Sequence, residues 1–337
     1  MRKSLPLLPL ALLLLAPPVL AENVLEQFPD TRTLIDEMVS EHGFDNEELT
    51  RLFAQVEFQP KIIETISRPA EGKPWYQYRP IFLTEARIRG GVKFWSENAE
   101  LLAQAEQAYG VPAQVVVAII GVETFYGRHK GGDKVIEALS TLGFGYPKRS
   151  VFFRNQIKEF LLMAREEQRD PLGFRGSYAG AMGMPQFMPS SFRNYAVDFD
   201  KDGHRDLWDN RADIIGSVAN YFARHHWKSG EPVTSRATVP VGAAEQFLKD
   251  NVESDIALSK LRAAGITVQQ PLAEQPAALL ALDGSAEEKE YWVTLHNFYV
   301  ITRYNRSPLY AMAVHQLSEA IRTTRAAELR KASRTAG

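Results

Sequence analysis

One segment constrains the fold of this chain more than any other, namely VPAQVVVAIIGVETFYG at residues 111–127. Its middle, residues 115–120, is apolar on every face of a helix, and that pattern is typical of a helix buried in a protein core. Pro112 suits the first helical position, and Gly127 suits the end. The segment therefore predicts a globular, mainly helical protein whose core surrounds this helix.

Further helices are expected on both sides of this segment, and a small sheet near the C-terminal end. Phe94–Tyr109 has amphipathic spacing, with Ser96 as a candidate N-cap and Gly110 at the glycine position that ends a helix. From residue 231 to residue 296, short Val-, Thr- and Leu-rich runs are broken by Gly and Pro. The last two runs, AALLALDG and KEYWVTLH, have the pattern of a β-hairpin. Helical spacing resumes over 307–328.

The first 21 residues have the pattern of a secretory signal peptide. Arg2 and Lys3 form a short cationic start, and a Leu-rich run of about a dozen residues follows. Val19 and Ala21 are small residues at the two positions that a cleavage site before Glu22 requires. The apolar run is too short to span a membrane. We expect a mature protein that is exported, soluble and periplasmic.

The charge and the cysteine content exclude several classes of protein. Without Arg2 and Lys3 the 39 basic residues become 37, against 41 acidic ones. Nucleic-acid-binding domains normally carry a basic excess, so we expect no nucleic-acid partner. The chain contains no cysteine. This excludes disulfides, thiolate zinc sites, a cysteine nucleophile and a lipid attached to an N-terminal cysteine.

Glu123 is the first candidate for chemistry. It stands near the C-terminal end of the helix that is otherwise apolar all round. Burial and the negative end of the helix dipole both disfavour a carboxylate there. A carboxylic acid that stays neutral near pH 7 can protonate a glycosidic oxygen. The alternative is a core glutamate that is neutralised by Arg128 or Lys130.

The second candidate is GSYAGAMGMPQFMPSSF at residues 176–192. Its small residues allow a backbone to approach a ligand closely, and Ser177 and Gln186 supply uncharged hydrogen-bonding groups. Such a mixture of polar groups and apolar walls suits a sugar polymer. Four apolar side chains either wall a groove or are buried beneath a tight glycine-rich turn, and the pattern leaves both readings open: Met182, Met184, Phe187 and Met188.

The third candidate is the acidic loop DFDKDGHRDLWD at residues 198–209. Its residues match positions 1, 3, 5, 6 and 9 of an EF-hand calcium loop, in the order Asp198, Asp200, Asp202, Gly203 and Asp206. The His204 carbonyl stands at position 7, and Asp209 replaces the usual Glu at position 12. Asp213 is the alternative last ligand. We expect one structural Ca²⁺ and no catalytic cofactor.

The fourth candidate is the aromatic cluster in NFYVITRYNRSPLYAMAVHQL at residues 297–317. Tyr299, Tyr304, Asn305 and Tyr310 gather around Pro308. Aromatic faces stack on sugar rings, but tyrosines that precede a helix more often belong to a core. The pattern by itself favours the core interpretation.

Taken together, five segments resemble the lytic murein transglycosylase B family, and their order and spacing also match. They are GVETFYGR (121–128), GSYAGAMGMPQFMPSSF (176–192), DFDKDGHRDLW (198–208), GSVANYF (216–222) and FYVITRYNRSPLYAMAVHQL (298–317). The resemblance implies a mainly α fold with a lysozyme-like core. It implies an α domain of residues 22–90 with the C-terminal helix 307–328, a catalytic core of 91–230 completed by 297–310, and a small β-containing domain of 231–296.

The resemblance also implies an activity, which is cleavage of the β-1,4 bond between N-acetylmuramic acid and N-acetylglucosamine in peptidoglycan without water. Glu123 matches the family's acid, which then acts as base and leaves a 1,6-anhydro end. Groove residues of the family match Tyr78, Ser177, Gln186, Tyr304, Asn305 and Tyr310. Lys148 and Arg149 stand where the family places basic residues near the peptide stem.

The same resemblance sets the expected partners. They are peptidoglycan glycan strands and other cell-wall enzymes, bound by a monomer. The chain departs from the family at two points: the acidic loop is one residue longer before Asp213, and there is no cysteine for the lipid anchor that family members often carry. Two alternatives remain, a muramidase that admits water and a peptidoglycan-binding protein without activity.

Overall fold

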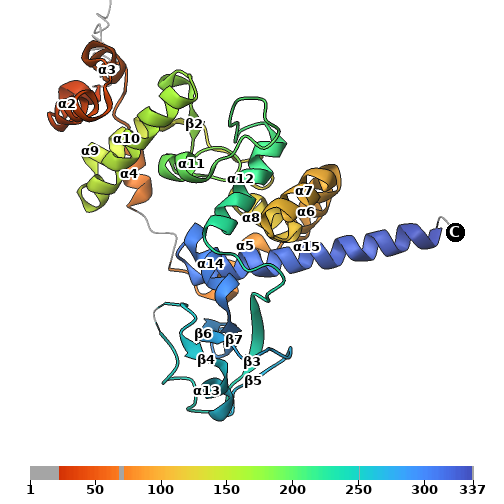
Figure 1. Ribbon diagram of the computed structural model, residues 1–337. Coiled ribbons are helices and arrows are strands. Elements are labelled where there is room, and N and C mark those ends of the chain that lie inside the picture. The colour runs from red at the N-terminus through yellow and green to blue at the C-terminus, as the bar shows by residue number, and fades with distance from the viewer. Residues whose placement is uncertain (1–22, 68–71, 250, 336–337) are drawn as a thin grey trace, which may run out of the picture. The chain divides into compact units, whose positions relative to one another are not determined.

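The computed structural model describes residues 23–67, 72–249 and 251–335, so the predicted signal peptide lies outside the described residues. The chain separates after Phe58 into two compact units, and Figure 1 labels their helices and strands. Residues 59–67 and 72–90, which were expected in the α domain, cluster with the larger unit.

The described part of the smaller unit, residues 23–58, contains three helices, α1 Val24–Gln27, α2 Asp30–His42 and α3 Asn46–Phe53. Helix α2 ends at Gly43, which adopts the left-handed φ of 64° that favours glycine at this position. Two residues later, Asp45 caps α3 by accepting a hydrogen bond from the Glu48 N–H at 2.8 Å. The short connection therefore turns the chain sharply enough for the two helices to pack together.

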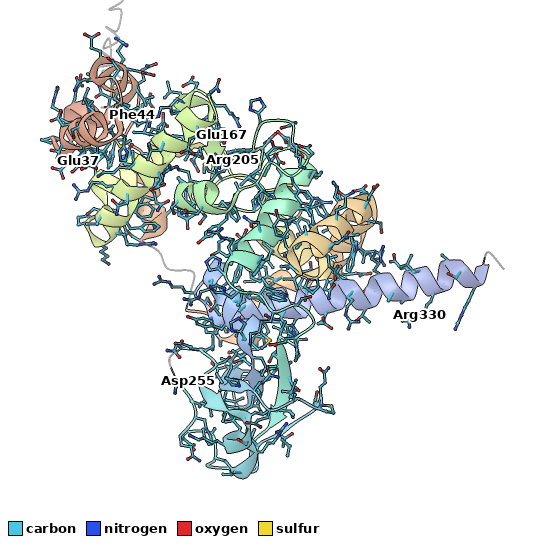
Figure 2. The ribbon with its side chains drawn as sticks, viewed as in Figure 1. Glu37, Phe44, Glu167, Arg205, Asp255 and Arg330 are labelled. Atoms are coloured by element: carbon cyan, nitrogen blue, oxygen red, sulfur yellow. The ribbon has the colours of Figure 1, made fainter. Side chains whose placement is uncertain are left out.

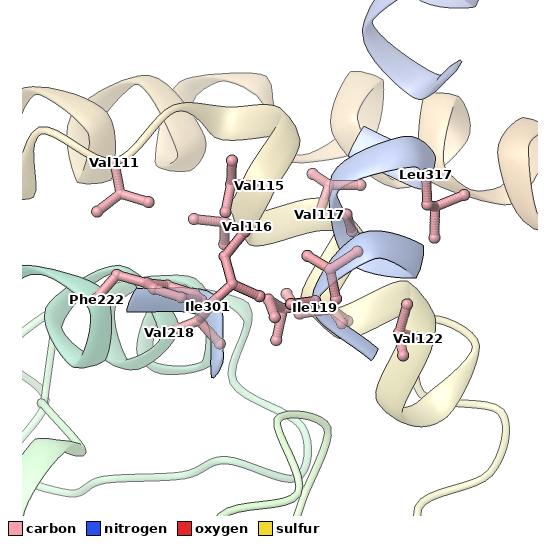
Figure 3. Packing of buried hydrophobic residues seen from close by; sticks show 14 of the residues in the cluster. Val111, Val115, Val116, Val117, Ile119, Val122, Val218, Phe222, Ile301 and Leu317 are labelled. Carbon is pink, nitrogen blue, oxygen red and sulfur yellow. The ribbon is translucent and has the colours of Figure 1, made fainter. Parts of the chain in front are cut away.

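The helices of the larger unit surround α8, Ala113–Thr124. Within α8, the side chains of Val117, Ala118, Ile119 and Ile120 are fully buried. Figure 3 shows this packing, in which α8 meets residues of α12 and of the C-terminal helices. The predicted core helix is confirmed. The other helices of this unit are α4 Pro60–Ile66, α5 Trp75–Phe82, α6 Glu85–Glu97, α7 Ala99–Tyr109, α9 Val135–Gly145, α10 Ser150–Glu166, α11 Pro189–Tyr195, α12 Arg211–Arg224, α14 His296–Tyr304 and α15 Pro308–Thr335, with 3₁₀ turns η1 Pro147–Arg149 and η2 Pro171–Gly173.

The predicted helix from Phe94 to Tyr109 is wrong at its start. The structure has two helices here, and Asn98 between them leaves the helical region with φ −123° and ψ 28°. Ser96 is no N-cap, because it lies inside α6 and its hydroxyl donates to the Val92 carbonyl at 2.9 Å. That local bond satisfies the hydroxyl without ending the helix. Gly110 ends α7 with φ 70°, as predicted.

A five-stranded antiparallel sheet has the order β4-β6-β7-β3-β5. The predicted hairpin is confirmed, since Asp283 of β6 pairs with Lys289 of β7 at its closed end. Alternate residues of β6 face opposite sides. Leu279 belongs to a core between the sheet and α13, whereas Leu280 belongs to the core around α8. The elements are β3 Thr234–Thr238, β4 Ile256–Ala257, α13 Leu258–Ala263, β5 Thr267–Val268, β6 Pro276–Asp283 and β7 Lys289–Thr294; a separate two-stranded ladder pairs β1 Asp133–Lys134 with β2 Arg175–Gly176.

Helix α15 continues to Thr335, beyond the predicted end at residue 328. In Figure 1 it runs past α6 toward the C-terminus. In the described part of the chain, no single helix has the length and apolarity to cross a membrane. Helices α7 and α8 meet these criteria only as a pair bent by 113°.

Candidate active site

Glu123 is the second-last residue of α8, and its side chain keeps partial exposure at the end of an otherwise buried helix. The Tyr310 hydroxyl of α15 donates a hydrogen bond to its Oε1 at 2.5 Å. Burial raises the pKa of Glu123 to about 7, and the hydrogen bond from Tyr310 opposes that rise. The acid is therefore substantially protonated at neutral pH while it remains reachable from outside, as a proton donor must be.

Neither of the two nearby cations neutralises Glu123. The Arg128 guanidinium lies over the Phe125 ring, 4.7 Å from its centre. The Lys130 ammonium contacts Asp209 Oδ1 at 2.9 Å. Among the described residues, burial and Tyr310 are the influences on the pKa of Glu123, and no second carboxylate contributes. The alternative of a core glutamate paired with a cation is not supported.

Two tyrosines at the junction of α14 and α15 lie beside Glu123. The rings of Tyr304 and Tyr310 are nearly parallel, at 9°, with centres 6.5 Å apart. Burial and the charge of Glu123 hold the pKa of both hydroxyls well above the usual range. Both tyrosines therefore remain proton-bearing hydrogen-bond donors. Pro308 starts α15 directly behind the bend, where a proline at the first helical position costs no hydrogen bond.

The other predicted groove residues of this junction lie at its edges. Asn305 is exposed and its Oδ1 accepts the Ser307 N–H at 3.0 Å, which closes the bend before α15. Tyr78 of α5 packs against Phe82, with ring centres 5.1 Å apart. It is close enough to Tyr310 to raise the pKa of that hydroxyl. The structure thus brings Tyr78 from another helix close to Tyr310, the hydrogen-bond partner of the acid.

The glycine-rich segment 176–190 joins the site through hydrogen bonds of its backbone. The Tyr304 hydroxyl donates to the Pro185 carbonyl at 2.5 Å. The side-chain amide of Gln186 donates to the Gly183 carbonyl at 2.9 Å, and the Ser177 hydroxyl accepts the Ala181 N–H at 3.1 Å. Ser177 therefore organises the segment itself, and Gln186 also joins it to the turn after α8, because its amide donates to the Lys130 carbonyl at 3.2 Å.

The apolar side chains of this segment resolve the two alternatives left open by the sequence. Met182, Met184 and Phe187 are buried at 0–3% exposure. These three side chains pack in the protein interior and do not line a groove, whereas Met188 is partly exposed. Gly183 has a φ of 68°, and a Cβ there would lie 2.4 Å from the Leu207 carbonyl oxygen. Only glycine allows that close backbone approach.

Thr124 is a site residue that sequence reasoning missed. Its hydroxyl donates to the Met184 carbonyl at 3.0 Å and accepts the Gly127 N–H at 3.1 Å. It follows Glu123 directly, so it fixes the end of α8 to the glycine-rich segment. A threonine beside a glutamate carries no sequence signal for this role, because its partner stands 60 residues away.

The turn after Glu123 is strained. Phe125 and Tyr126 have φ values of 51° and 60°, in the left-handed region that side chains with a Cβ disfavour. Tyr126 is held there because its hydroxyl donates to the Arg87 carbonyl at 2.8 Å. The Arg87 Nε in turn donates to the Gly121 carbonyl at 3.0 Å. Strained residues that the surroundings hold in place are typical of functional sites.

Replacing Gly121 with alanine tests this support. The added Cβ would lie 2.5 Å from the Tyr126 hydroxyl oxygen. We expect a loss of stability of about 1–3 kcal/mol, measured by thermal unfolding, and a lower kcat for the peptidoglycan cleavage that the family resemblance implies. Gly143→Ala in α9 is the matched control, because its closest contact is the flexible end of Ile157 at 3.0 Å. Unchanged unfolding and kcat in Gly121→Ala would contradict the proposed support.

Tyr310→Phe tests the coupling of the tyrosine to the acid. The lost hydrogen bond stabilises the charged form of Glu123, so the pKa of Glu123 should rise and the alkaline limb of the pH–rate profile should move to higher pH. We expect the rate near pH 6 to fall about ten-fold or more, since hydrogen bonds to charged groups contribute about 1.5–3 kcal/mol. Tyr304→Phe should leave the limb in place, because that hydroxyl donates to Pro185. An unmoved limb in Tyr310→Phe would be the contrary result.

Lys148 and Arg149 lie apart from these contacts. Both are exposed in the turn η1 between α9 and α10. The Arg149 guanidinium lies over the Phe152 ring, 4.3 Å from its centre. No described contact joins either residue to Glu123.

The acidic loop brings three of its predicted ligands together. Carboxylate oxygens of Asp198, Asp200 and Asp202 lie within 4.8 Å of one another. The Asp198 carboxylate accepts the N–H groups of Asp202 and Gly203, and Gly203 has a φ of 97°. Several hard oxygen donors that converge in one loop fit Ca²⁺.

The other predicted calcium ligands, Asp209, Asp213 and His204, differ in their contacts. Neither Asp209 nor Asp213 belongs to this group of three carboxylates, and Asp209 is turned toward Lys130. Asp213 is buried, and its two oxygens accept the N–H groups of Phe199 and Asp206. Burial raises the pKa of Asp213 to about 6, and the charges of neighbouring loop aspartates add to the rise. The His204 N–H donates to Asp202, which fixes the backbone at position 7.

An ion pair anchors the acidic loop to α10. The Arg205 guanidinium contacts the buried Glu167 carboxylate at 2.5 Å, and Figure 2 labels both side chains. A second contact joins Arg205 to Glu166 at 3.3 Å. The loop is therefore held in position by protein groups that lie outside the carboxylate cluster.

Glu123 lies at the end of a buried core helix, beside Tyr304 and Tyr310, and its pKa is raised to about 7. These are the features of a lysozyme-like enzyme that cleaves glycans. The Transglycosylase SLT domain model matches residues 27–319, and the chain belongs to this family. The membrane-bound lytic murein transglycosylase B of Escherichia coli (strain K12) is 45% identical over 308 residues, which cover 88% of this chain and 84% of that protein.

Solved structures agree. The crystal structure of the soluble lytic transglycosylase SltB1 from Pseudomonas aeruginosa has a TM-score of 0.84 at 52% identity, and the match covers 88% of this chain and 100% of that chain. The Escherichia coli lytic transglycosylase Slt35 in complex with calcium has a TM-score of 0.82 at 42% identity, over 93% and 100% of the two chains. The expected fold class, mainly α with a lysozyme-like core and a small sheet, is confirmed.

Proposed function

We propose that this protein is a peptidoglycan lytic transglycosylase, which cleaves the β-1,4 bond between N-acetylmuramic acid and N-acetylglucosamine without water. One observation carries the proposal. Glu123 has a pKa of about 7 and a tyrosine as its hydrogen-bond partner, and no other described carboxylate acts on it. Ordinary glycosidases use two carboxylates. A single acid suits a reaction in which the substrate supplies its own nucleophile.

The reaction uses Glu123 twice. Protonated Glu123 gives its proton to the glycosidic oxygen, and the bond from that oxygen to C1 of the muramoyl sugar breaks. The C6 hydroxyl of the same sugar then forms a bond to C1. Its proton passes to the Glu123 carboxylate, which restores the starting acid. No water is consumed, and the muramoyl sugar ends as a 1,6-anhydro ring.

Tyr310 supports both steps. Its hydroxyl donates to Glu123 at 2.5 Å, so it stabilises the carboxylate that exists between the two proton transfers. Burial favours the protonated acid at the beginning. The two effects hold the pKa near 7, where one group both gives and accepts a proton efficiently.

The remaining residues of the site bind the glycan in this proposal. Tyr78 and Tyr304 are partly exposed and present ring faces to the sugars, since aromatic faces suit sugar rings. The buried Tyr310 acts on the bound sugar through its hydrogen bond to Glu123. Ser177, Gln186 and Asn305 offer hydroxyl and amide groups at the edge of the site. Lys148 and Arg149 are exposed cations and would contact the peptide stem of a longer substrate.

Digestion of purified sacculi tests the function. The protein should release soluble muropeptides whose muramic ends resist borohydride, because a 1,6-anhydro end cannot open to an aldehyde. Products that borohydride reduces would identify a hydrolytic muramidase. Binding to sacculi without any release would identify a peptidoglycan-binding protein without activity.

The acidic loop binds one structural Ca²⁺ in this proposal, as the calcium complex of Slt35 supports. Asp198, Asp200 and Asp202 supply carboxylates, and His204 supplies its carbonyl. Asp213 supplies the last carboxylate because Asp209 is engaged by Lys130. The ion binds and orders the loop, and it takes no part in the bond cleavage.

Calcium should therefore raise the melting temperature of the chelated protein. With a dissociation constant of about 1 mM, typical of extracellular sites, 10 mM Ca²⁺ would add about 1.4 kcal/mol, or roughly 2–5 °C. Asp198→Asn should abolish the shift and Asp209→Asn should retain it. A shift that is lost in Asp209→Asn would restore Asp209 as a ligand, and no shift in the wild type would argue against the site.

The proposed location is the periplasm, after removal of residues 1–21. The proposed partners are peptidoglycan strands and other cell-wall enzymes, and the proposed state is a monomer.

A further inference from the structure

A second hollow lies in the larger unit, away from Glu123. It has a volume of about 610 Å³. Its walls come from the start of α8, from residues 315–320 of α15, and from strands β3 and β7 of the sheet. Trp227 and Trp292 are among the lining residues.

This hollow is separate from the catalytic site. Gln114, which lines it, precedes Glu123 by nine residues on the same helix, or about 13 Å along the axis at 1.5 Å per residue. On α15, Gln316 follows Tyr310 by six residues, or about 9 Å. None of the residues assigned above to the catalytic groove lines the hollow.

Two residues that line the hollow carry unsatisfied polar atoms. The Trp227 Nε1 and the Gln316 Oε1 are buried, and neither has a hydrogen-bond partner among the described residues. A buried polar atom without a partner costs about 1–3 kcal/mol, and such atoms in folded proteins usually contact a water or a ligand.

An adjoining hollow extends the same region. It shares Arg79, Leu83 and Glu290 with the first, and it is also lined by Trp75. The Trp75 Nε1 is likewise buried without a partner in the described part of the chain. Unsatisfied donors and acceptors therefore gather where the sheet meets the helical core.

The charges around the hollow are largely neutralised within the protein. Glu290 pairs with Arg236 at 3.6 Å, Glu231 with Lys228 at 3.7 Å and Glu319 with Arg322 at 2.7 Å. Burial lowers the pKa of His315 to about 4, so its ring is neutral at pH 7. Arg79 also lines the hollow and forms no ion pair among the described residues, so the net charge around the hollow is small and slightly positive.

Uncharged polar groups and indole rings remain. Four glutamines line the hollow, and within the described residues no hydrogen bond is made by any of their side-chain amides: Gln114, Gln269, Gln270 and Gln316. Carboxamides offer a donor and an acceptor together, which matches hydroxyl and acetamido groups. Indole faces match the apolar faces of sugar rings.

We infer that this hollow is a second, non-catalytic binding site for an N-acetylated saccharide strand. The site holds the glycan to the enzyme at a distance from the bond that is cleaved. The inference rests on the proposed function only for the identity of the sugars, because the lining itself selects a neutral saccharide.

Fluorine NMR tests the inference. The chain has five tryptophans, so labelling with 5-fluorotryptophan gives five signals, which single Trp→Phe variants assign. The protein carries Glu123→Gln to prevent turnover, and the probe is tetra-N-acetylchitotetraose. We expect the Trp227 and Trp292 signals to shift saturably with the probe, while Trp95 and Trp208, which do not line the hollow, stay in place.

Variants identify the contact. Gln269→Ala/Gln270→Ala changes two exposed side chains and should weaken this binding about ten-fold or more, since two hydrogen bonds of about 1 kcal/mol are lost. Gln104→Ala/Gln107→Ala, on the exposed face of α7, is the matched control and should bind as before.

Three results would overturn the inference. The first is no shift of Trp227 or Trp292 at about 10 mM saccharide, the range of weak binding. The second is shifts that the glutamine variants do not affect. The third is shifts with a free stem peptide but none with the saccharide, which would make this a peptide site. Because no turnover is measured, a wrong assignment of the reaction at Glu123 would leave this readout intact.

Discussion

Glu123→Gln should abolish muropeptide release from sacculi, with a loss of at least about 10³-fold. The amide keeps the size and shape of the side chain, but it cannot give a proton to the glycosidic oxygen or accept one from the C6 hydroxyl. General acid–base steps contribute about 10²–10⁴-fold each, and the proposed mechanism uses this one residue for both. Tyr310 can still donate to the amide oxygen, so the surrounding fold should persist.

The stability of the same variant provides an independent check. The pKa of Glu123 rises from 4.5 to about 7 in the folded protein, so the folded state holds a proton that the unfolded state releases between these values. Stability of the wild type should therefore fall as pH rises through that window. Glutamine does not titrate.

We accordingly expect Glu123→Gln to equal the wild type in stability at pH 4 and to exceed it at pH 8 by up to about 3 kcal/mol. Chemical denaturation at the two pH values measures the difference. Activity within a few-fold of the wild type would remove Glu123 from the mechanism. A stability difference that does not depend on pH would contradict the raised pKa of Glu123 in the folded protein.

The sequence predicts much of the helical core because its signals are local. The apolar run of α8 requires burial whatever surrounds it, and the structure buries it. The β6–β7 hairpin likewise depends on neighbouring residues only. The break at Asn98 was missed, because Ser96 is a good capping residue that can also form a bond inside a helix.

The catalytic site depends on contacts between distant residues, and single-sequence patterns do not reveal these. Tyr310 meets Glu123 across 187 residues. Considered alone, the tyrosines around Pro308 favoured a core role, and the structure shows that Tyr310 is both buried and bonded to the acid. A distant contact also keeps Asp209 out of the carboxylate cluster of the acidic loop, since its partner Lys130 lies 79 residues earlier.

The support of the strained turn was also invisible in the sequence. Arg87 belongs to α6 and Tyr126 to the turn after α8, and no local pattern indicates that the two residues meet. Their hydrogen bonds join α6 to the end of α8. Such supporting residues become visible only when the helices are packed.

The products of digestion should carry 1,6-anhydro ends, because the C6 hydroxyl of the same sugar is a nucleophile at a much higher effective concentration than water. Effective concentrations of well-placed intramolecular groups reach about 10⁵ M or more, against about 55 M for water. Each muropeptide should therefore be about 18 mass units lighter than the product of hydrolysis of the same bond. Lysozyme digestion of the same sacculi supplies the comparison.

Digestion in ¹⁸O-labelled water tests the central claim most directly. Mass spectrometry of the released muropeptides should show no label at C1 of the muramoyl sugar, because its ring closes through its own C6 oxygen. Lysozyme in the same labelled water should incorporate one ¹⁸O at each new end. Label at C1 in the products of this protein would mean that water attacks the intermediate, and the transglycosylase assignment would then be wrong.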